Sequence, residues 1–217
     1  YGVLSGGTRY GRYGVLRFRS SANYTGSSRG YMITNGYGAN KFAILQSTSA
    51  TTMPDIASAG GGVSNGQVPF MIDNAGRVSQ ALQPYFEVYR SGSQSGYNAA
   101  SSPYTAVVIY NNANANIGGH YNTSTGFFTA PFAGVYYFIA AAYCGFTCGQ
   151  AWFSSTSGRI AGTDMVLAGM GQFPSAWIIL NMSANDTVGF HPYSSSTTSG
   201  TIYANGNHTY FRGYFLG

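Results

Sequence analysis

Residues Gly118 to Tyr143 read GGHYNTSTGFFTAPFAGVYYFIAAAY, and the second half of this stretch is an almost unbroken run of apolar and aromatic residues. Successive side chains of a β-strand point to opposite faces, so Tyr136 and Phe138 would share one face while Tyr137 and Ile139 share the other. Both faces are then apolar, whereas a sandwich strand in a monomer buries only its inner face. The stretch therefore predicts a strand whose outer face something else covers.

Two further segments show the same two-sided pattern. Residues 106–110 read AVVIY, and residues 176–180 read AWIIL, in which Trp177 and Ile179 would lie opposite Ile178. Burying one large apolar side chain contributes roughly 1.5 to 3 kcal/mol of stabilising free energy. Three such strands with one face exposed to water would therefore lose about the whole free energy of unfolding of a domain. Association of identical subunits about a symmetry axis would cover these faces. We therefore expect a homo-oligomer, with N-terminal strands folded back as a lid as the alternative.

The composition favours an all-β protein. Only 7% of the 217 residues are charged, and Glu and Lys occur once each, at Glu87 and Lys41, too few for the polar faces of amphipathic helices. Tyr and Phe, which suit pleated surfaces, number 19 and 14. No window approaches the roughly 20 apolar residues of a transmembrane helix, so we expect no membrane insertion.

The net charge of +5 comes from the N-terminal part of the chain. Residues 1–82 carry seven Lys or Arg against two Asp, whereas residues 83–217 balance three Arg against three acids. The basic residues are spread without clustering, and a nucleic-acid groove needs a basic stripe with reading elements. We expect no nucleic-acid partner.

The spacing of apolar segments and turns predicts two parts, divided near Gln83. Residues 1–82 read as short strands cut by Gly-rich turns, with a loop or linker over residues 48–66, and form a smaller β-rich module. Residues 83–217 show about ten short strands at close spacing, typical of a sandwich or jelly roll. The chain starts at Tyr1 without Met, and we expect a processed or excised fragment.

The opening stretch resembles the signature of C1q domains. In that signature an aromatic residue is followed at set distances by Asn or Asp, an aromatic residue, Phe, and then Gly-x-Tyr-x-Phe-x-aromatic. Six positions fall in this register: Asn116, Tyr121, Phe128, Gly134, Tyr136 and Phe138. Two depart from it, since Tyr110 replaces Phe and Ala140 replaces the last aromatic residue. The closing segment YFRGYFL, with Phe211 and Gly213, is also similar to the family's last strand.

The resemblance implies a fold and a mode of assembly. Residues 83–217 would form a ten-stranded jelly roll of the C1q and TNF superfamily that trimerises about a three-fold axis and serves as a recognition head. The residues expected in the core and the trimer contact are Tyr110, Asn116, Tyr121, Phe128, Gly134, Tyr136, Tyr137, Phe138, Trp177, Ile179, Phe211 and Gly213. Some relatives hold calcium near the axis, for which Asp164 and Asp186 are the candidate ligands here, too few for a site of six to eight oxygens. We therefore predict no cofactor.

The junction between the two parts carries a second resemblance. Residues 72–92, IDNAGRVSQALQPYFEVYRSG, are similar to the segment that precedes C1q-like domains in tail fibres of bacteriophages. This resemblance implies that residues 1–82 attach the head to a fibre or to other virion proteins.

Motifs for catalysis are sparse. GVSNG, residues 62–66, matches G-x-S-x-G, but neither a hydrophobic strand before Ser64 nor a helix after it is indicated, so we interpret it as a turn. Asp73 and Asp186 lie in turn contexts, where a carboxylate usually caps the backbone. The three histidines, His120, His191 and His208, show no paired ligand spacing and are interpreted as surface or hydrogen-bonded residues. We expect neither an enzyme nor a metal centre.

The two cysteines lie four positions apart, at Cys144 and Cys148. A small loop disulfide in an oxidising compartment is one reading, and two reduced structural thiols are the other.

Together these features predict a non-catalytic trimeric protein of a virion surface or the extracellular space. Its head would bind a host glycan or protein through loops rich in Tyr, Asn, Ser and Gly, a mixture suited to recognition. The alternatives are a secreted cellular C1q-like lectin or a structural component of a matrix or filament, and, second, a polysaccharide depolymerase.

Overall fold

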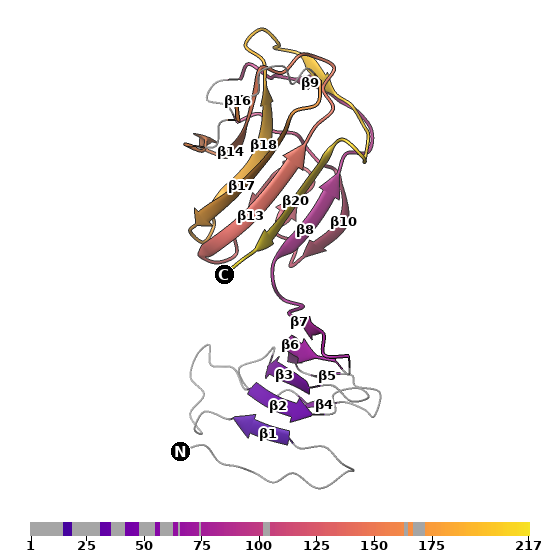
Figure 1. Ribbon diagram of the computed structural model, residues 1–217, viewed down its shortest axis with the longest axis vertical. Coiled ribbons are helices and arrows are strands. Elements are labelled where there is room, and N and C mark those ends of the chain that lie inside the picture. Colours follow the sequence, from indigo (N-terminus) through magenta and orange to yellow (C-terminus); the bar gives the residue numbers. More distant parts are fainter. Residues whose placement is uncertain are drawn as a thin grey trace. The chain divides into compact units, whose positions relative to one another are not determined.

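The structure is a computed structural model that describes residues 15–18, 31–35, 42–47, 55–56, 63–64, 66–73, 75–101, 105–162, 165–166 and 172–217 (Figure 1). Across these residues the chain is all β, as the composition predicts, and contains no helix that could span a membrane. The chain divides into two compact units, Tyr1–Gln83 and Pro84–Gly217. Each unit is described by itself.

The first unit contains one antiparallel sheet in the order β1-β2-β3-β6-β7. Its strands are β1 (Val15–Phe18), β2 (Tyr31–Asn35), β3 (Phe42–Ser47), β6 (Gly66–Ile72) and β7 (Val78–Ser79). Ala43 and Leu45 of β3 are buried, with Val68 and Met71 of β6 packed against them. The loop expected over residues 48–66 contains a further short pair, β4 (Asp55–Ile56) and β5 (Val63–Ser64). That prediction was therefore wrong in part, because Gly-rich and Ser-rich composition conceals a two-residue pairing.

Asp73 closes the turn between β6 and β7. Its Oδ1 accepts hydrogen bonds from the backbone N–H groups of Ala75 and Arg77, at 2.9 and 3.0 Å, and its Oδ2 lies 2.7 Å from the Arg77 side chain. The backbone hydrogen bond from Arg77 is the main reason that the pKa of Asp73 is lowered. The capping role expected for this residue is confirmed.

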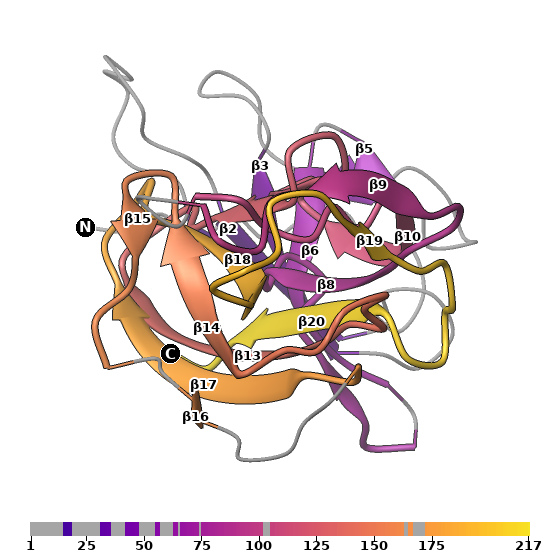
Figure 2. The same cartoon turned by 90° about the horizontal axis from the view of Figure 1, so that it is seen from above.

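The second unit, here called the head, is a two-layer sandwich. The layer that we name the open sheet has the order β10-β8-β20-β13-β17. Figure 1 shows its strands side by side, and Figure 2, from above, shows β13 and β17 facing β14 and β18 across the interior. The open sheet consists of β8 (Tyr85–Tyr89), β10 (Asn112–Ile117), β13 (Gly134–Ala141), β17 (Ser175–Met182) and β20 (Tyr210–Phe215).

The layer that we name the covered sheet has the order β11-β12-β18-β14-β15, with β16 also paired to β14. Its strands are β11 (Tyr121–Asn122), β12 (Phe127–Thr129), β14 (Gln150–Ser155), β15 (Gly158–Arg159), β16 (Met165–Val166) and β18 (Thr187–Tyr193). A separate pair is formed by β9 (Gln94–Tyr97) and β19 (Gly200–Ile202). The described part of the head thus has thirteen strand segments where ten were expected, with five along each main path.

Residues 106–110 do not form the strand that their apolar run predicts. Val107, Val108 and Tyr110 are buried. However, the N–H groups of this segment donate mainly to side chains, and that of Val108 donates to the backbone carbonyl of Phe190. The N–H of Ile109 donates to Gln94 Oε1 at 2.9 Å, and the N–H of Tyr110 donates to the Tyr121 hydroxyl at 3.2 Å. The prediction was wrong because side-chain acceptors take the place of a ladder partner.

The aromatic core joins the two sheets. Phe86 of β8 lies 5.1 Å from both Tyr121 and Phe128 of the covered sheet and 4.9 Å from Phe211 of β20, between ring centroids. Gly213 of β20 lies against the rings of Phe86 and Phe138. A Cβ at Gly213 would come within 2.5 Å of Phe86 and 2.6 Å of Phe138. The glycine is therefore required by packing.

His191 of β18 is buried on the outer side of the covered sheet. Its Nε2 lies 3.1 Å from the carbonyl oxygen of Ala99, its Nδ1 contacts the carbonyl oxygen of Ala106, and its ring stacks on Trp152 with centroids 5.1 Å apart. Burial lowers the pKa of His191 despite the two carbonyl groups, which act in the opposite direction. The His191 ring thus packs between the sheet and the segment before β10, with a carbonyl oxygen of that segment beside each of its two nitrogens.

Replacing Gly213 by Ala should destabilise the head, because the new methyl group would overlap Phe86 and Phe138. Overpacking of this kind costs about 1 to 3 kcal/mol, to be measured by chemical denaturation. Gly206→Ala is the matched control, since its nearest neighbour would lie 3.5 Å away, on Tyr89. Equal stability of the two variants would contradict the packing described here.

His191 should make the head less stable in mild acid. Because its pKa is lowered on folding, the unfolded chain binds the proton first, so the stabilisation is complete above about pH 6.5 and is lost as the pH falls below it. We expect the melting temperature to fall between pH 7.5 and pH 5 and His191→Gln to remove most of that slope. His208→Gln, at an exposed position, should keep it; a slope unchanged by His191→Gln would refute the assignment.

Candidate functional site

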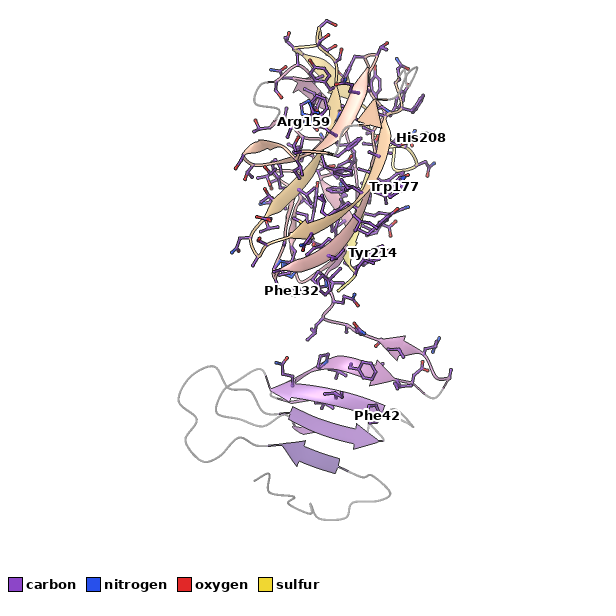
Figure 3. All side chains as sticks on the ribbon, turned by 60° about the vertical axis from the view of Figure 1, so that its left-hand side comes forward. Phe42, Phe132, Arg159, Trp177, His208 and Tyr214 are labelled. Atoms are coloured by element: carbon purple, nitrogen blue, oxygen red, sulfur yellow. The ribbon has the colours of Figure 1, made fainter. Side chains whose placement is uncertain are left out.

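Large apolar side chains project from the outer face of the open sheet. Trp177 and Ile179 of β17 are 59% and 54% exposed, and Tyr214 of β20 is 43% exposed. Figure 3 shows Trp177 and Tyr214 on the same side of the head. Monomeric soluble proteins rarely expose a large contiguous apolar surface, and where one is exposed it usually marks an interaction site.

The strand register brings these side chains together. Tyr137 of β13 pairs with Ile179 on one side and Tyr214 on the other, and Ile139 pairs with Trp177. The ring of Tyr137 lies 6.5 Å from that of Trp177 and 5.3 Å from that of Tyr214. These five residues, named here the open face, form one apolar surface across three strands. It is the outer face that the opening stretch of sequence predicts.

The open face continues past the end of β13. Tyr143 lies there with its ring 4.7 Å from Phe173 and 4.8 Å from Tyr203, between centroids, and His208 contacts Phe173 at 5.5 Å. Phe173 and Tyr203 are both exposed. The apolar surface is therefore longer than the strands that support it.

A satisfied ion pair borders the open face. Arg212 Nη2 of β20 lies 2.9 Å from Glu87 Oε1 of β8, and the Tyr85 hydroxyl donates to Glu87 Oε2 at 3.0 Å. The hydrogen bond from Tyr85 is the main cause of the lowered pKa of Glu87, and burial raises the pKa of Tyr85. Since each charge has its partner on the same chain, burial of this face would leave neither charge unpaired.

The covered sheet differs because the chain itself covers its outer face. His191 contacts two carbonyl groups of the segment before β10, and the Tyr97 hydroxyl donates to the carbonyl of Pro192 at 3.3 Å. Trp152 is 1% exposed and has the Arg159 guanidinium 4.9 Å from its ring centre. Of the two sheets, the open sheet alone has a large apolar outer face left exposed within the described residues.

The residues expected in the core and trimer contact separate into two groups. The structure buries Tyr110, Tyr121, Phe128, Tyr136, Phe138 and Phe211 within the sandwich. It places Tyr137, Trp177 and Ile179 outside, on the open face. The alternation in the sequence already placed Ile139 on this face with Tyr137, but sequence reasoning missed Tyr214, although its alternation with Gly213 is the signal that would have identified it.

Three signature positions shape the backbone. Asn116 bridges a turn: its Nδ2 donates to the carbonyl of Tyr121 at 2.8 Å, and its Oδ1 accepts from the N–H of Tyr121 at 3.1 Å. Gly134 begins β13 at a φ of 152°, where a Cβ would come within 2.4 Å of Phe215. With Gly213, these residues set the path of the strands.

Cys144 and Cys148 are free thiols in the structure, and both are buried. A hydrogen bond from Cys148 and burial raise the pKa of Cys144, so its thiol stays protonated. Of the two readings of this pair, the structure has the reduced one, in which each cysteine packs as a small apolar residue. The disulfide stays a prediction.

The described residues contain no group of three or more His, Cys, Asp and Glu side chains placed to hold a metal ion. Asp186 caps a turn, accepting from the N–H of Ser183 at 2.7 Å, and Asp164 lies outside the described residues. Ser64 lies in the short strand β5, where no nucleophile elbow forms. His120 contacts the ring of Phe128, and burial lowers the pKa of its imidazole.

Comparison with solved structures gives neighbours at low identity. The chain is similar to the globular domain of zebrafish complement 1qA protein (20% identity, TM-score 0.42, covering 62% of this chain and 98% of that one). It is also similar to Eiger TNF from S. frugiperda (11%, 0.40, 63% and 92%) and to murine APRIL at pH 8.0 (9%, 0.42, 62% and 99%). A search of curated proteins finds no match.

The family comparison is more specific. A family model described as the C1q domain matches residues 90–216, which include every strand of the open sheet except β8. Since the matched residues make up more than half of the chain, this protein belongs to the C1q domain family.

Proposed function

We propose that this protein is a non-catalytic, homotrimeric adhesion protein whose C1q head binds a receptor on a host surface. The observation that carries the proposal is the open face, an apolar surface on β13, β17 and β20 that no other described residue of the head covers. C1q and TNF homologues form homotrimers, and their domains are typically extracellular and generally non-catalytic. Two further copies of the chain are the occupant that we propose for the open face.

The chemistry of the open face suits burial between copies. Its centre is aromatic and aliphatic, the composition typical of the core of an obligate interface. The Glu87–Arg212 pair at its border already satisfies its own charges. Three heads on one axis would then present three receptor sites together, so that weak single contacts add to a strong attachment.

The setting that we propose is the fibre of a virus or bacteriophage. The support is the likeness of residues 72–92 to the junction before C1q-like domains of tail fibres. Residues 1–82 would then join the head to the fibre or to other virion proteins, while a secreted cellular lectin or matrix protein remains the alternative. The genes that flank the coding sequence distinguish these settings, since virion structural genes are expected for the first.

Adhesion is tested by incubating the labelled, purified protein with an array of surface polysaccharides and proteins. We expect saturable binding to at least one of them with no release of new reducing ends, because glycoside hydrolysis needs a pair of carboxylates and the chain has only five Asp and Glu residues. New reducing ends would establish a depolymerase and overturn the non-catalytic assignment. Absence of binding across the array would overturn the adhesion role.

Trp177→Lys should break the trimer, because it replaces the most exposed aromatic side chain of the open face by a charge. Loss of a large aromatic contact costs roughly 2 to 4 kcal/mol per interface, which should give monomers at micromolar concentration. Native mass spectrometry should show about 69 kDa for the parent, three times 23.0 kDa, and 23.0 kDa for the variant.

The control is Thr129→Lys, which adds the same charge at an exposed position of the covered sheet. It should remain trimeric. Dissociation by both variants, or by neither, would contradict the assignment of the open face as the contact.

A further inference from the structure

A hollow lies at the end of the head where β17 ends. Its walls come from two stretches of the chain: residues 155–160, around the turn between β14 and β15, and residues 180–187, from the end of β17 through the turn into β18. Its volume is about 360 Å³, within the range of small-ligand pockets. Residues distant in sequence thus form a site of molecular size.

Uncharged polar groups dominate the lining of this hollow. Hydroxyl and amide side chains come from both stretches, among them Thr156, Asn181 and Asn185. Leu180 and Met182 add apolar surface, and Asp186 supplies a carboxylate. None of the residues that line the hollow is a Lys, Arg or His.

Hydrogen bonds within the protein fix the walls in place. The N–H of Thr156 donates to Thr187 Oγ1 at 2.9 Å, which ties the first turn to β18. Asp186 Oδ2 accepts from the N–H of Ser183 at 2.7 Å. Asn185 has a φ of 72° and donates its N–H to the carbonyl of Ala130 at 2.8 Å. The site is therefore largely preformed, which reduces the entropic cost of binding.

We propose that this hollow binds one neutral sugar unit of a host surface glycan. Each sugar hydroxyl both donates and accepts hydrogen bonds, and the amides, hydroxyls and carboxylate of the lining offer partners of both kinds. Leu180 and Met182 offer apolar surface to the C–H groups of the ring. The inference rests on the proposed adhesion role and names its ligand class and site.

The charges of the hollow select among sugars. Without a cation, the site cannot neutralise a uronate, a sialate or a phosphate, and the Asp186 carboxylate repels each of them. An apolar ligand would leave the hydroxyl and amide groups unpaired. A neutral hexose is the class that satisfies both conditions.

The test is saturation-transfer NMR and calorimetry on the intact chain with methyl glucoside, methyl galactoside and methyl mannoside. We expect at least one to bind with a dissociation constant of about 1 mM, or roughly 4 kcal/mol of binding free energy. Methyl glucuronide, which differs from methyl glucoside by a carboxylate, should bind at least about fivefold more weakly than the corresponding neutral sugar, because it meets Asp186. Equal or tighter binding of the glucuronide would overturn the charge argument.

Two variants locate the site. Asn185→Gly removes the side-chain amide while keeping a φ that glycine adopts freely, and should weaken binding of the neutral sugar about fivefold. Asp186→Asn keeps an acceptor for Ser183 but removes the charge, and should bring glucuronide binding close to that of glucoside. Asn207→Gly, in an exposed turn before β20, is the control and should bind like the parent.

The outcomes separate this inference from the proposed function. If the protein binds a polysaccharide or protein on the array while Asn185→Gly and Asp186→Asn bind it like the parent, adhesion stands and the hollow is not its site. Binding of a peptide ligand in the hollow, shown by loss in the same two variants, would overturn the saccharide class. Absence of binding to the array and to all three glycosides overturns both.

Discussion

Burial of the outer face of β13 is the constraint on which the rest of this protein depends. The strand is apolar on both sides: Tyr136 and Phe138 fill the sandwich, while Tyr137 and Ile139 face away from it. The inner side chains hold the two sheets together, and the outer ones continue into Trp177 and Ile179 of the neighbouring strand. One strand thus serves the stability of the domain and, in the proposed trimer, the contact between copies.

The two sheets meet this constraint differently. The segment before β10 covers the outer face of β14 and β18, fastened by His191 and Tyr97. The described residues of the head provide no equivalent segment for the outer face of the open sheet. Assembly of copies about an axis is the economical solution, because it uses surface that each copy already presents and leaves the border ion pair intact.

Much of this architecture is readable from the sequence, since period-two alternation fixes which residues of β13 and β17 share a face. The segment Ala106 to Tyr110 has the same composition but is no strand, because Gln94 and Tyr121 supply its acceptors. Side-chain acceptors that take the place of backbone carbonyls depend on tertiary contacts, and the periodicity of the sequence does not encode those contacts.

The signature residues show a second limit of sequence reasoning. Their spacing identifies the domain, but it does not separate core positions such as Phe128 from outer-face positions such as Tyr137, which the strand register decides. The hollow beside Asn185 is less predictable still, because two stretches of chain about twenty residues apart form it, around residues 155–160 and 180–187. Its one local signal is an Asn-Asp pair in a turn, which is common in loops of any function.

Tryptophan fluorescence tests the central claim most directly. The chain has two tryptophans; Trp152 is buried within the head, and Trp177 is 59% exposed on a single copy. If the open face is the contact between copies, acrylamide should quench neither residue appreciably in the native protein, and Trp177→Phe should change this little. A readily quenched component that disappears in Trp177→Phe would show that the open face is in water, and would contradict the account.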